Sequence, residues 1–249
     1  MGVDYASLTQ LLKIIPPIRK KERMLMLGRQ SLQLNRPRLK RAANRLLDEF
    51  QPGLTIEELE RENGFAEPLF EALGVQHVQS LDYSQFEGAS FAHDLNTPIP
   101  SELVGKFDIV LDGGTLEHVF DVKTAMTNAF DLLAPGGTFI AASPGNNWFA
   151  HGFYQFGPEL VFSFWKRTKG CDVLQCTFLP EFPRDAPFEI EDPYETKRRL
   201  RMAKKLVPQR CYLFYVVRKP LEASDVSETP LQGDYTHRWS EAGSDEDGA

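Results

Sequence analysis

The sequence has few cysteines and no glycine-rich dinucleotide motif. Its three cysteines, Cys171, Cys176 and Cys211, form no close CxxC pair and have no histidine partner at ligand spacing. This pattern argues against a disulfide framework and against a zinc site. Gly28 follows an apolar run but starts no GxGxxG, which argues against a nicotinamide-dependent oxidoreductase.

Long apolar runs and a targeting signal are also missing. No run of about 18 apolar residues occurs, so we predict no transmembrane segment. The N-terminus, MGVDYASLTQLLKIIPPIRKKER, lacks the basic start, apolar centre and small-residue cleavage site of a secretory signal. Because the cysteines are also unpaired, we expect a cytoplasmic protein.

Positive charge is scarce at the C-terminal end of the chain. The net charge is −7, and residues 222–249 hold eight acidic groups and one arginine, whereas the rest of the chain is balanced. Nothing in this balance favours nucleic-acid binding. We expect residues 221–249 to form an acidic disordered tail that solvates the protein, with a role in interactions as the alternative.

The most informative stretch lies in the middle of the 249 residues and predicts a βαβ unit. An apolar run over residues 107–111 is broken by the acidic, glycine-rich turn 112–115. Apolar residues then recur at helical spacing over 119–133, until Pro-Gly-Gly at 135–137 precedes a second strand at 138–142. Ligands bind at the carboxyl ends of such strands. The residues expected on this rim are Asp112, Gly113, Glu117 and His118.

This stretch also carries a family resemblance. FDIVLDGGTLEHVFD, a helix, and then LLAPGGTFIAASP together resemble the fourth strand, following helix and fifth strand of class I S-adenosylmethionine-dependent methyltransferases. The resemblance covers residues 22–145 well and the remainder loosely. It implies an α/β fold with a Rossmann-like, doubly wound, mostly parallel seven-stranded sheet and helices on both faces. We expect this domain over residues 22–220, with a helical insertion at 35–74 and an N-terminal helical extension at 1–21.

The resemblance implies S-adenosyl-L-methionine as the cofactor and assigns residues to it. The acid that ends the second strand, Asp82, corresponds to the ribose-binding position, although a strand-end Asp also caps helices. Asp94 and Leu95 correspond to the adenine contact, with an Asx turn as the alternative. The cofactor-binding residues predicted in this way are Leu27, Gly28, Arg29, Asp82, Asp94, Leu95, Asp112, Gly113 and Glu117.

The turn after the first strand departs from the family pattern. Gly28 alone stands where the family has several glycines that let the backbone approach the cofactor. Arg29 and Gln30 follow it, and their side chains are placed to narrow the pocket. An ordinary turn at Gly28 is the competing interpretation, under which cofactor binding is lost but the fold is kept.

Candidates for catalysis follow the fourth and fifth strands. His118 is a candidate general base or a structural residue, and the polar, aromatic segment after residue 145 adds His151 and Tyr154 as possible acceptor contacts. Glu117 and His118 alone offer too few ligands for a defined metal site, so we predict no metal. A basic helix over residues 197–205 is expected to be a solvated face or to meet an anionic acceptor.

The function predicted from these patterns is methyl transfer from S-adenosylmethionine to an unidentified small-molecule or sugar-like acceptor. No nucleic-acid partner is expected. The rival hypothesis is a non-catalytic binding or scaffold protein that keeps the methyltransferase fold, and the missing glycines after Leu27 favour it.

Overall fold

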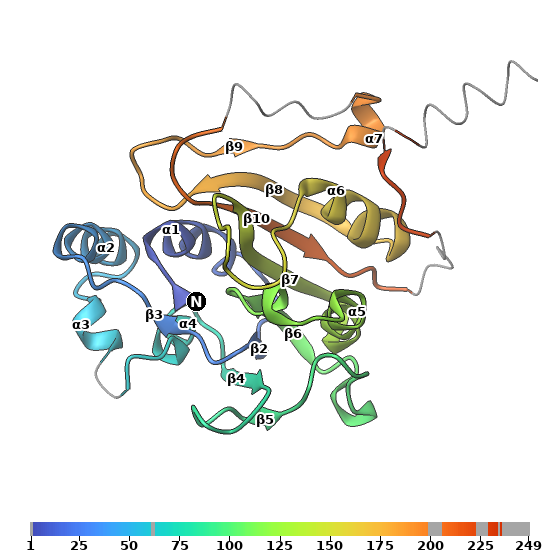
Figure 1. Ribbon diagram of the computed structural model, residues 1–249. Helices are drawn as coiled ribbons and strands as arrows, with labels where there is room; N and C mark the ends of the chain where they lie inside the picture. Colours follow the sequence, from blue (N-terminus) through green and yellow to red (C-terminus); the bar gives the residue numbers. More distant parts are fainter. Residues whose placement is uncertain (1, 61–62, 199–205, 223–228, 234, 236–249) are drawn as a thin grey trace, which may run out of the picture.

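The computed structural model describes residues 2–60, 63–198, 206–222, 229–233 and 235 (Figure 1). The strands are β1 (Gly2–Val3), β2 (Arg23–Leu27), β3 (Ser31–Leu32), β4 (His77–Asp82), β5 (Phe91–Ala92), β6 (Phe107–Asp112), β7 (Leu133–Asn146), β8 (Asp172–Pro180), β9 (Phe188–Glu189) and β10 (Cys211–Arg218). The helices are α1 (Tyr5–Ile14), α2 (Pro37–Phe50), α3 (Ile56–Leu59), α4 (Glu67–Ala72), η1 (Ser101–Leu103), η2 (Leu116–His118), α5 (Val122–Leu132), α6 (Pro158–Leu160), η3 (Val161–Thr168) and α7 (Pro193–Thr196).

The central sheet has the order β5-β4-β2-β6-β7-β10-β8-β9. The strands from β5 to β7 are parallel, β10 is antiparallel to both its neighbours, and β9 is antiparallel to β8. The Rossmann-like α/β fold is therefore confirmed, with a sheet that is mixed at one end. It has eight strands rather than seven because the two-residue strand β9 pairs with the edge of β8.

The chain winds away from β2 in both directions, which creates a switch point between β2 and β6. Successive residues of β2 face opposite sides of the sheet, so Leu25 and Leu27 pack with α5 in one core while Met24 and Met26 pack with α1 and α2 in the other. Figure 1 shows these helices on opposite sides of the sheet. Ligands of doubly wound sheets bind at such a switch point, outside the carboxyl ends of the strands.

The N-terminal segment, predicted as an extension, is packed into the fold. The Asp4 side chain accepts a hydrogen bond from the Ser7 N–H and caps α1, whose Leu8 and Leu11 are fully buried. The two-residue strand β1 pairs in parallel with β3. The described part of the predicted insertion contains α2, α3 and α4, and the Thr55 hydroxyl caps α3 by accepting the Glu58 N–H.

The fifth strand is predicted to start after the Pro-Gly-Gly sequence, but it already starts at Leu133. β7 runs through this sequence, and the register against β6 jumps between the pairs Phe107↔Leu133 and Ile109↔Thr138. A bulge of this kind lets a strand absorb extra residues without ending. The preceding helix α5 starts at Val122 rather than Val119, because Asp121 caps it by accepting the Thr124 N–H.

The C-terminal part differs from the expected tail. Residues 229–233 lie against the domain, where Ser163 donates to the Leu231 carbonyl and the Gly233 N–H donates to Glu159. Most of the predicted basic helix, residues 199–205, lies outside the described residues, and α7 ends at Thr196, before it. No helix in the described ranges is long and apolar enough to cross a membrane.

Candidate functional site

The carboxyl ends of the parallel strands surround a cavity of about 220 Å³ beside the switch point. Asp82 ends β4, and Asp94 and Leu95 follow β5, so that three predicted cofactor residues line this one cavity. His118, at the end of η2, also lines it. Sequence reasoning missed six further lining residues, which lie close to the predicted residues in the sequence: Leu81, Tyr83, His93, Asn96, Thr115 and Val119.

The two carboxylates of this cavity are held by local hydrogen bonds. Asp82 accepts the N–H of Tyr83 at 2.6 Å. Asp94 accepts both the backbone N–H and the side-chain amide of Asn96, at 2.9 and 2.7 Å, and these bonds lower the pKa of Asp94 below its ordinary value. The Asx turn proposed as an alternative for Asp94 is therefore present, and the same residue still lines the cavity.

The turn after β2 is filled by Gln30. Gly28 adopts φ +69°, and a side chain there would meet the Thr115 hydroxyl at 2.7 Å. The buried Gln30 amide donates to the Leu27 carbonyl at 2.7 Å, and its side chain lies against Gly113. Gln30 therefore narrows the turn, as its position in the sequence predicts.

The side chain of Arg29 points toward α4 rather than into this turn. Its guanidinium donates to Glu67 at 2.6 Å and to the Glu87 carbonyl at 2.7 Å, and it stacks 4.0 Å from the centre of the Phe65 ring. The expectation that Arg29 narrows the pocket is therefore wrong. The ion pair with α4 accounts for its direction.

Asp112 shapes the turn that carries Glu117 and His118. Its fully buried carboxylate accepts the N–H groups of Gly114 and Thr115 at 3.2 and 2.8 Å, and the Ser143 hydroxyl at 3.4 Å. Burial raises the pKa of Asp112, and the backbone hydrogen bonds oppose that shift. Asp112 thus orders the start of η2, and it does not line the cavity described above.

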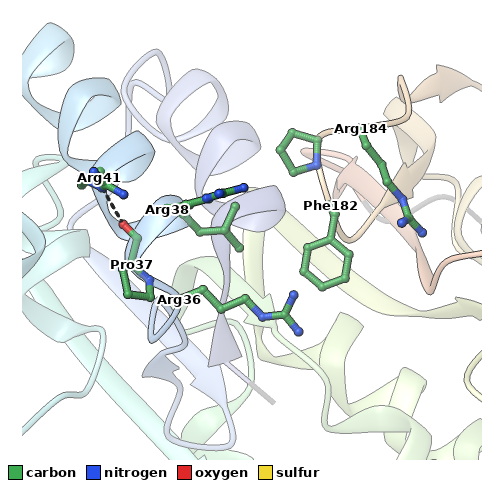
Figure 2. A pocket seen from close by; sticks show the side chains of 8 residues that line it. Arg36, Pro37, Arg38, Arg41, Phe182 and Arg184 are labelled. Atoms are coloured by element: carbon green, nitrogen blue, oxygen red, sulfur yellow. Dashed lines mark hydrogen bonds between the residues drawn. The ribbon is translucent and has the colours of Figure 1, made fainter.

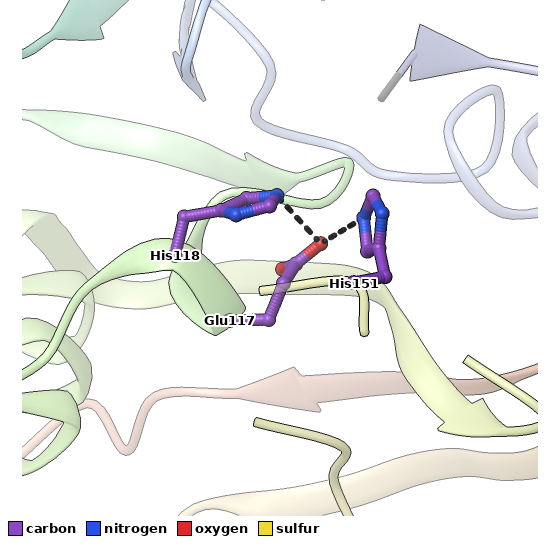
Figure 3. A group of neighbouring side chains, drawn as sticks. All are labelled: Glu117, His118 and His151. Atoms are coloured by element: carbon purple, nitrogen blue, oxygen red, sulfur yellow. Dashed lines mark ion pairs between the residues drawn. The ribbon is translucent and has the colours of Figure 1, made fainter. Parts of the chain in front are cut away.

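Glu117, His118 and His151 form a cluster at the end of β6 (Figure 3). Glu117 Oε1 lies 3.6 Å from His118 Nε2 and 3.5 Å from His151 Nε2, and both imidazoles point toward this oxygen. The two rings are 4.9 Å apart. Two residues predicted as alternative bases and one predicted as a cofactor contact therefore share a single site.

Backbone contacts bring the His151 segment against Glu117. The Glu117 carbonyl accepts the N–H of Phe153 at 2.7 Å, and Gly152, at φ +71°, lies so close that a Cβ there would be 2.7 Å from that carbonyl oxygen. Trp148 packs on the His151 ring and donates to the Cys211 carbonyl. Glycine is required at position 152 for both its backbone conformation and this close approach.

The cluster residues have shifted pKa values. Burial, and then the charge of Asp112, raise the pKa of Glu117 to about 8. Burial lowers the pKa of both His118 and His151. At neutral pH the two imidazoles are therefore uncharged, so each can accept a proton or bind a cation.

Tyr154, the third predicted catalytic residue, lies outside this cluster. Its hydroxyl donates to the Phe120 carbonyl at 2.7 Å, and its ring stacks on Phe156. A second cavity, of about 240 Å³, lies beyond this segment at the end of β7 and is lined by Asn146, Phe156, Phe178, Ile190, Leu206 and Tyr212, among others. Sequence reasoning missed it because β8 and β10 bring its walls together from distant parts of the chain.

A larger cavity, of about 590 Å³, shares no lining residue with the predicted site (Figure 2). It lies between the start of α2 and the segment after β8, and four arginines line it: Arg36, Arg38, Arg41 and Arg184. The guanidinium of Arg36 stacks 4.5 Å from the Phe182 ring. The surface that faces the cavity is nearly all apolar, so these side chains line it mainly with their carbon atoms.

No protein-family model matches the chain, and no curated protein matches it. Among solved structures it is similar to the 1,6-didemethyltoxoflavin-N1-methyltransferase of Burkholderia thailandensis, which was solved with S-adenosylhomocysteine (15% identity, 87% of this chain, 80% of that chain, TM-score 0.47). It is also similar to the N-methyltransferase NodS of Bradyrhizobium japonicum WM9 (12% identity, 86% of this chain, 94% of that chain, TM-score 0.44). A third similar structure is the [4+2]-cyclase SpnF (16% identity, 87% of this chain, 81% of that chain, TM-score 0.47). Likenesses this distant carry no argument about activity, which rests on the chain's own residues.

Proposed function

We propose that this protein transfers a methyl group from S-adenosylmethionine to a small-molecule or sugar-like acceptor. The observation that carries the proposal is the cavity in which Asp82, Asp94 and Leu95 meet beside the switch point. A carboxylate at Asp82 can accept hydrogen bonds from both ribose hydroxyls. Asp94 can accept one from the adenine amine while Leu95, 6% exposed, packs on the ring.

The cavity fits one part of the cofactor. Its 220 Å³ is below the roughly 300–1,000 Å³ of a typical ligand pocket, so it would take the nucleoside while the methionine part extends toward Gly28. Gln30 stands there. Its Oε1 is buried without a hydrogen-bond partner among the described residues. Moving this side chain outward therefore breaks the two bonds that its amide donates, to the Leu27 carbonyl at 2.7 Å and to the Gly28 carbonyl at 3.4 Å, and solvates an unpaired acceptor.

The chain's own contribution would be to hold the acceptor in line. S-adenosylmethionine supplies a methyl group that is already electrophilic, so much of the acceleration can come from positioning. The 240 Å³ cavity at the end of β7 is our candidate acceptor pocket, because it joins the polar Asn146 to apolar walls from Phe156 and Phe178. For a hydroxyl acceptor, the neutral His118 or His151 can accept the proton.

Calorimetric titration with S-adenosylmethionine and S-adenosylhomocysteine tests this proposal. We expect micromolar binding by the unmodified protein and at least tenfold weaker binding by Asp82→Ala. Glu102→Ala, an exposed carboxylate in η1 that does not line the cavity, is the matched control and should bind normally. If neither compound binds the unmodified protein, the proposal is wrong.

The second candidate is a non-catalytic binding protein, and two observations favour it. Gln30 occupies the turn that the cofactor must approach, and the arginine-lined cavity is a larger space that shares no lining residue with the predicted site. The same titration separates the two candidates. Absence of binding to both cofactor forms, combined with binding of an anion such as inorganic phosphate that Arg38→Ala weakens, would favour the binding protein.

A further inference from the structure

We propose that Glu117, His118 and His151 bind a divalent transition-metal ion of the Zn²⁺ type. The sequence alone gave no reason to expect a metal, because Glu117 and His118 supply two ligands. The fold adds the third by bringing His151 from the segment after β7, so that one ligand atom from each residue lies within 4.8 Å of the other two. Binding of the ion does not depend on the proposed methyl transfer.

The cluster contains buried polar atoms that lack partners. Glu117 is completely buried, yet neither of its carboxylate oxygens has a hydrogen-bond partner in the part of the chain that the structure describes. The same holds for His151 Nε2. An unpaired buried carboxylate is costly, and buried charges are normally paired or coordinate a metal. A single cation among these atoms would satisfy all of them at once.

The distances fit coordination better than hydrogen bonding. The separations of 3.5 and 3.6 Å between Glu117 Oε1 and the two Nε2 atoms exceed the 2.7–3.2 Å of an N–H···O hydrogen bond. Two ligand atoms bound to one tetrahedral Zn²⁺, each at roughly 2.1 Å, lie about 3.4 Å apart. Both imidazoles already direct a nitrogen toward Glu117 Oε1 (Figure 3).

The donor set selects the class of ion. Imidazole nitrogens favour zinc, iron, copper and nickel, whereas magnesium and calcium prefer oxygen ligands. Two histidines and one carboxylate are the three protein ligands of zinc sites that keep a fourth position open. The side chains of His118 and His151 are 47% and 32% exposed, so the site lies close to the protein surface although Glu117 Oε1 and His151 Nε2 are themselves buried.

The location gives the ion a role if the proposed function is correct. His118 lines the candidate cofactor cavity, so the ion would sit at the border between that cavity and the segment carrying His151. With the ion bound, His118 and His151 would act as ligands rather than as bases. An acceptor hydroxyl at the open position would then lose its proton more readily because a divalent cation stabilises the oxyanion. This effect of the ion on an acceptor hydroxyl rests on the proposed methyl transfer.

Metal titration of the purified full chain tests the site. After chelator treatment and dialysis, we expect one Zn²⁺ or one Co²⁺ per chain, with Co²⁺ giving visible absorption bands that Zn²⁺ abolishes. Glu117→Gln should weaken binding at least about 100-fold without loss of the fold, because the two side chains have the same shape. His77→Ala, at the exposed start of β4, should bind as the unmodified protein does.

Three outcomes are distinguishable. Zinc binding that Glu117→Gln and His151→Ala both abolish supports the site, even if S-adenosylhomocysteine does not bind and the proposed function fails. Zinc binding that neither variant changes, or no binding by the unmodified protein, would overturn the metal site. That result would not bear on cofactor binding, which is measured separately with S-adenosylhomocysteine.

Discussion

The carboxylate of Glu117 and the imidazole of His151 face each other at 3.5 Å, although they come from the turn after β6 and the segment after β7. The backbone enforces this relationship, because the Glu117 carbonyl accepts the N–H of Phe153. The contact places a buried carboxyl group, protonated at neutral pH in the metal-free protein, between two neutral histidines next to the candidate cofactor cavity.

Gly152→Ala tests whether that backbone contact positions His151. The alanine Cβ would meet the Glu117 carbonyl, and the alanine backbone would have to keep the positive φ of Gly152. We therefore expect a loss of about 1–3 kcal/mol in the free energy of unfolding. Zn²⁺ affinity should fall as well. Gly53→Ala, also at positive φ but with open space around it, should cost about 1 kcal/mol and leave zinc binding unchanged. Equal effects of both variants on both measurements would contradict this explanation.

Glu117→Gln should change the pH dependence of stability in the metal-free protein. Because burial raises the folded pKa of Glu117 to about 8, the folded state keeps a proton that the unfolded state releases. The free energy of unfolding therefore decreases as pH rises from about 4.5 to about 8. The variant should lack this decrease. Between pH 5 and pH 9 its free energy of unfolding should fall by roughly 2–4 kcal/mol less than that of the unmodified protein.

Urea unfolding with a chelator present, at pH 5, 7 and 9, measures this effect. Asp172→Asn, at an exposed carboxylate, serves as the control and should show the unmodified pH profile. Parallel profiles for the Gln variant and the unmodified protein would show that Glu117 is ionised in the folded state at neutral pH.

Asp112→Ala should destabilise the fold strongly. The change leaves the buried N–H group of Gly114 and the half-buried N–H group of Thr115 without their acceptor, which costs roughly 2–4 kcal/mol. The midpoint of denaturant unfolding measures it, and Asp172→Ala, whose partner Arg218 is also exposed, should change stability by less than about 1 kcal/mol. A similarly small change for Asp112→Ala would show that the turn does not depend on this carboxylate.

Gln30→Ala should strengthen cofactor binding. If the methionine part of S-adenosylhomocysteine needs the space that Gln30 fills, removing the side chain removes the roughly 1 kcal/mol cost of moving it. We expect three- to tenfold tighter binding by calorimetry, and unchanged binding by Gln33→Ala, an exposed neighbour. Weaker binding by Gln30→Ala would instead identify Gln30 as a direct contact.

The sheet and its rim could be predicted from the sequence because they depend on local patterns. The strand predicted before Asp82 and the apolar run that ends at Asp112 become β4 and β6, and parallel pairing with β2 brings their carboxyl ends together. The direction of Arg29 could not be predicted, since it depends on Glu67, a residue of the helical insertion.

The cluster of Glu117 with two histidines was equally beyond sequence reasoning. The position of His151 depends on the path of an irregular segment in which Asn147 and Ala150 adopt positive φ. Sequence periodicity gives no information on such a path. One signal was available in retrospect: the dipeptide His151-Gly152 couples a ligand-type side chain to a residue that permits close backbone approach.

A crystal structure of the protein soaked with S-adenosylhomocysteine tests the central claim most directly. We predict the ribose at Asp82, the adenine between Asp94 and Leu95, and Gln30 moved away from Gly113. Density for the ligand in the arginine-lined cavity between α2 and β8, or none in a protein soaked at saturating concentration, would contradict the account.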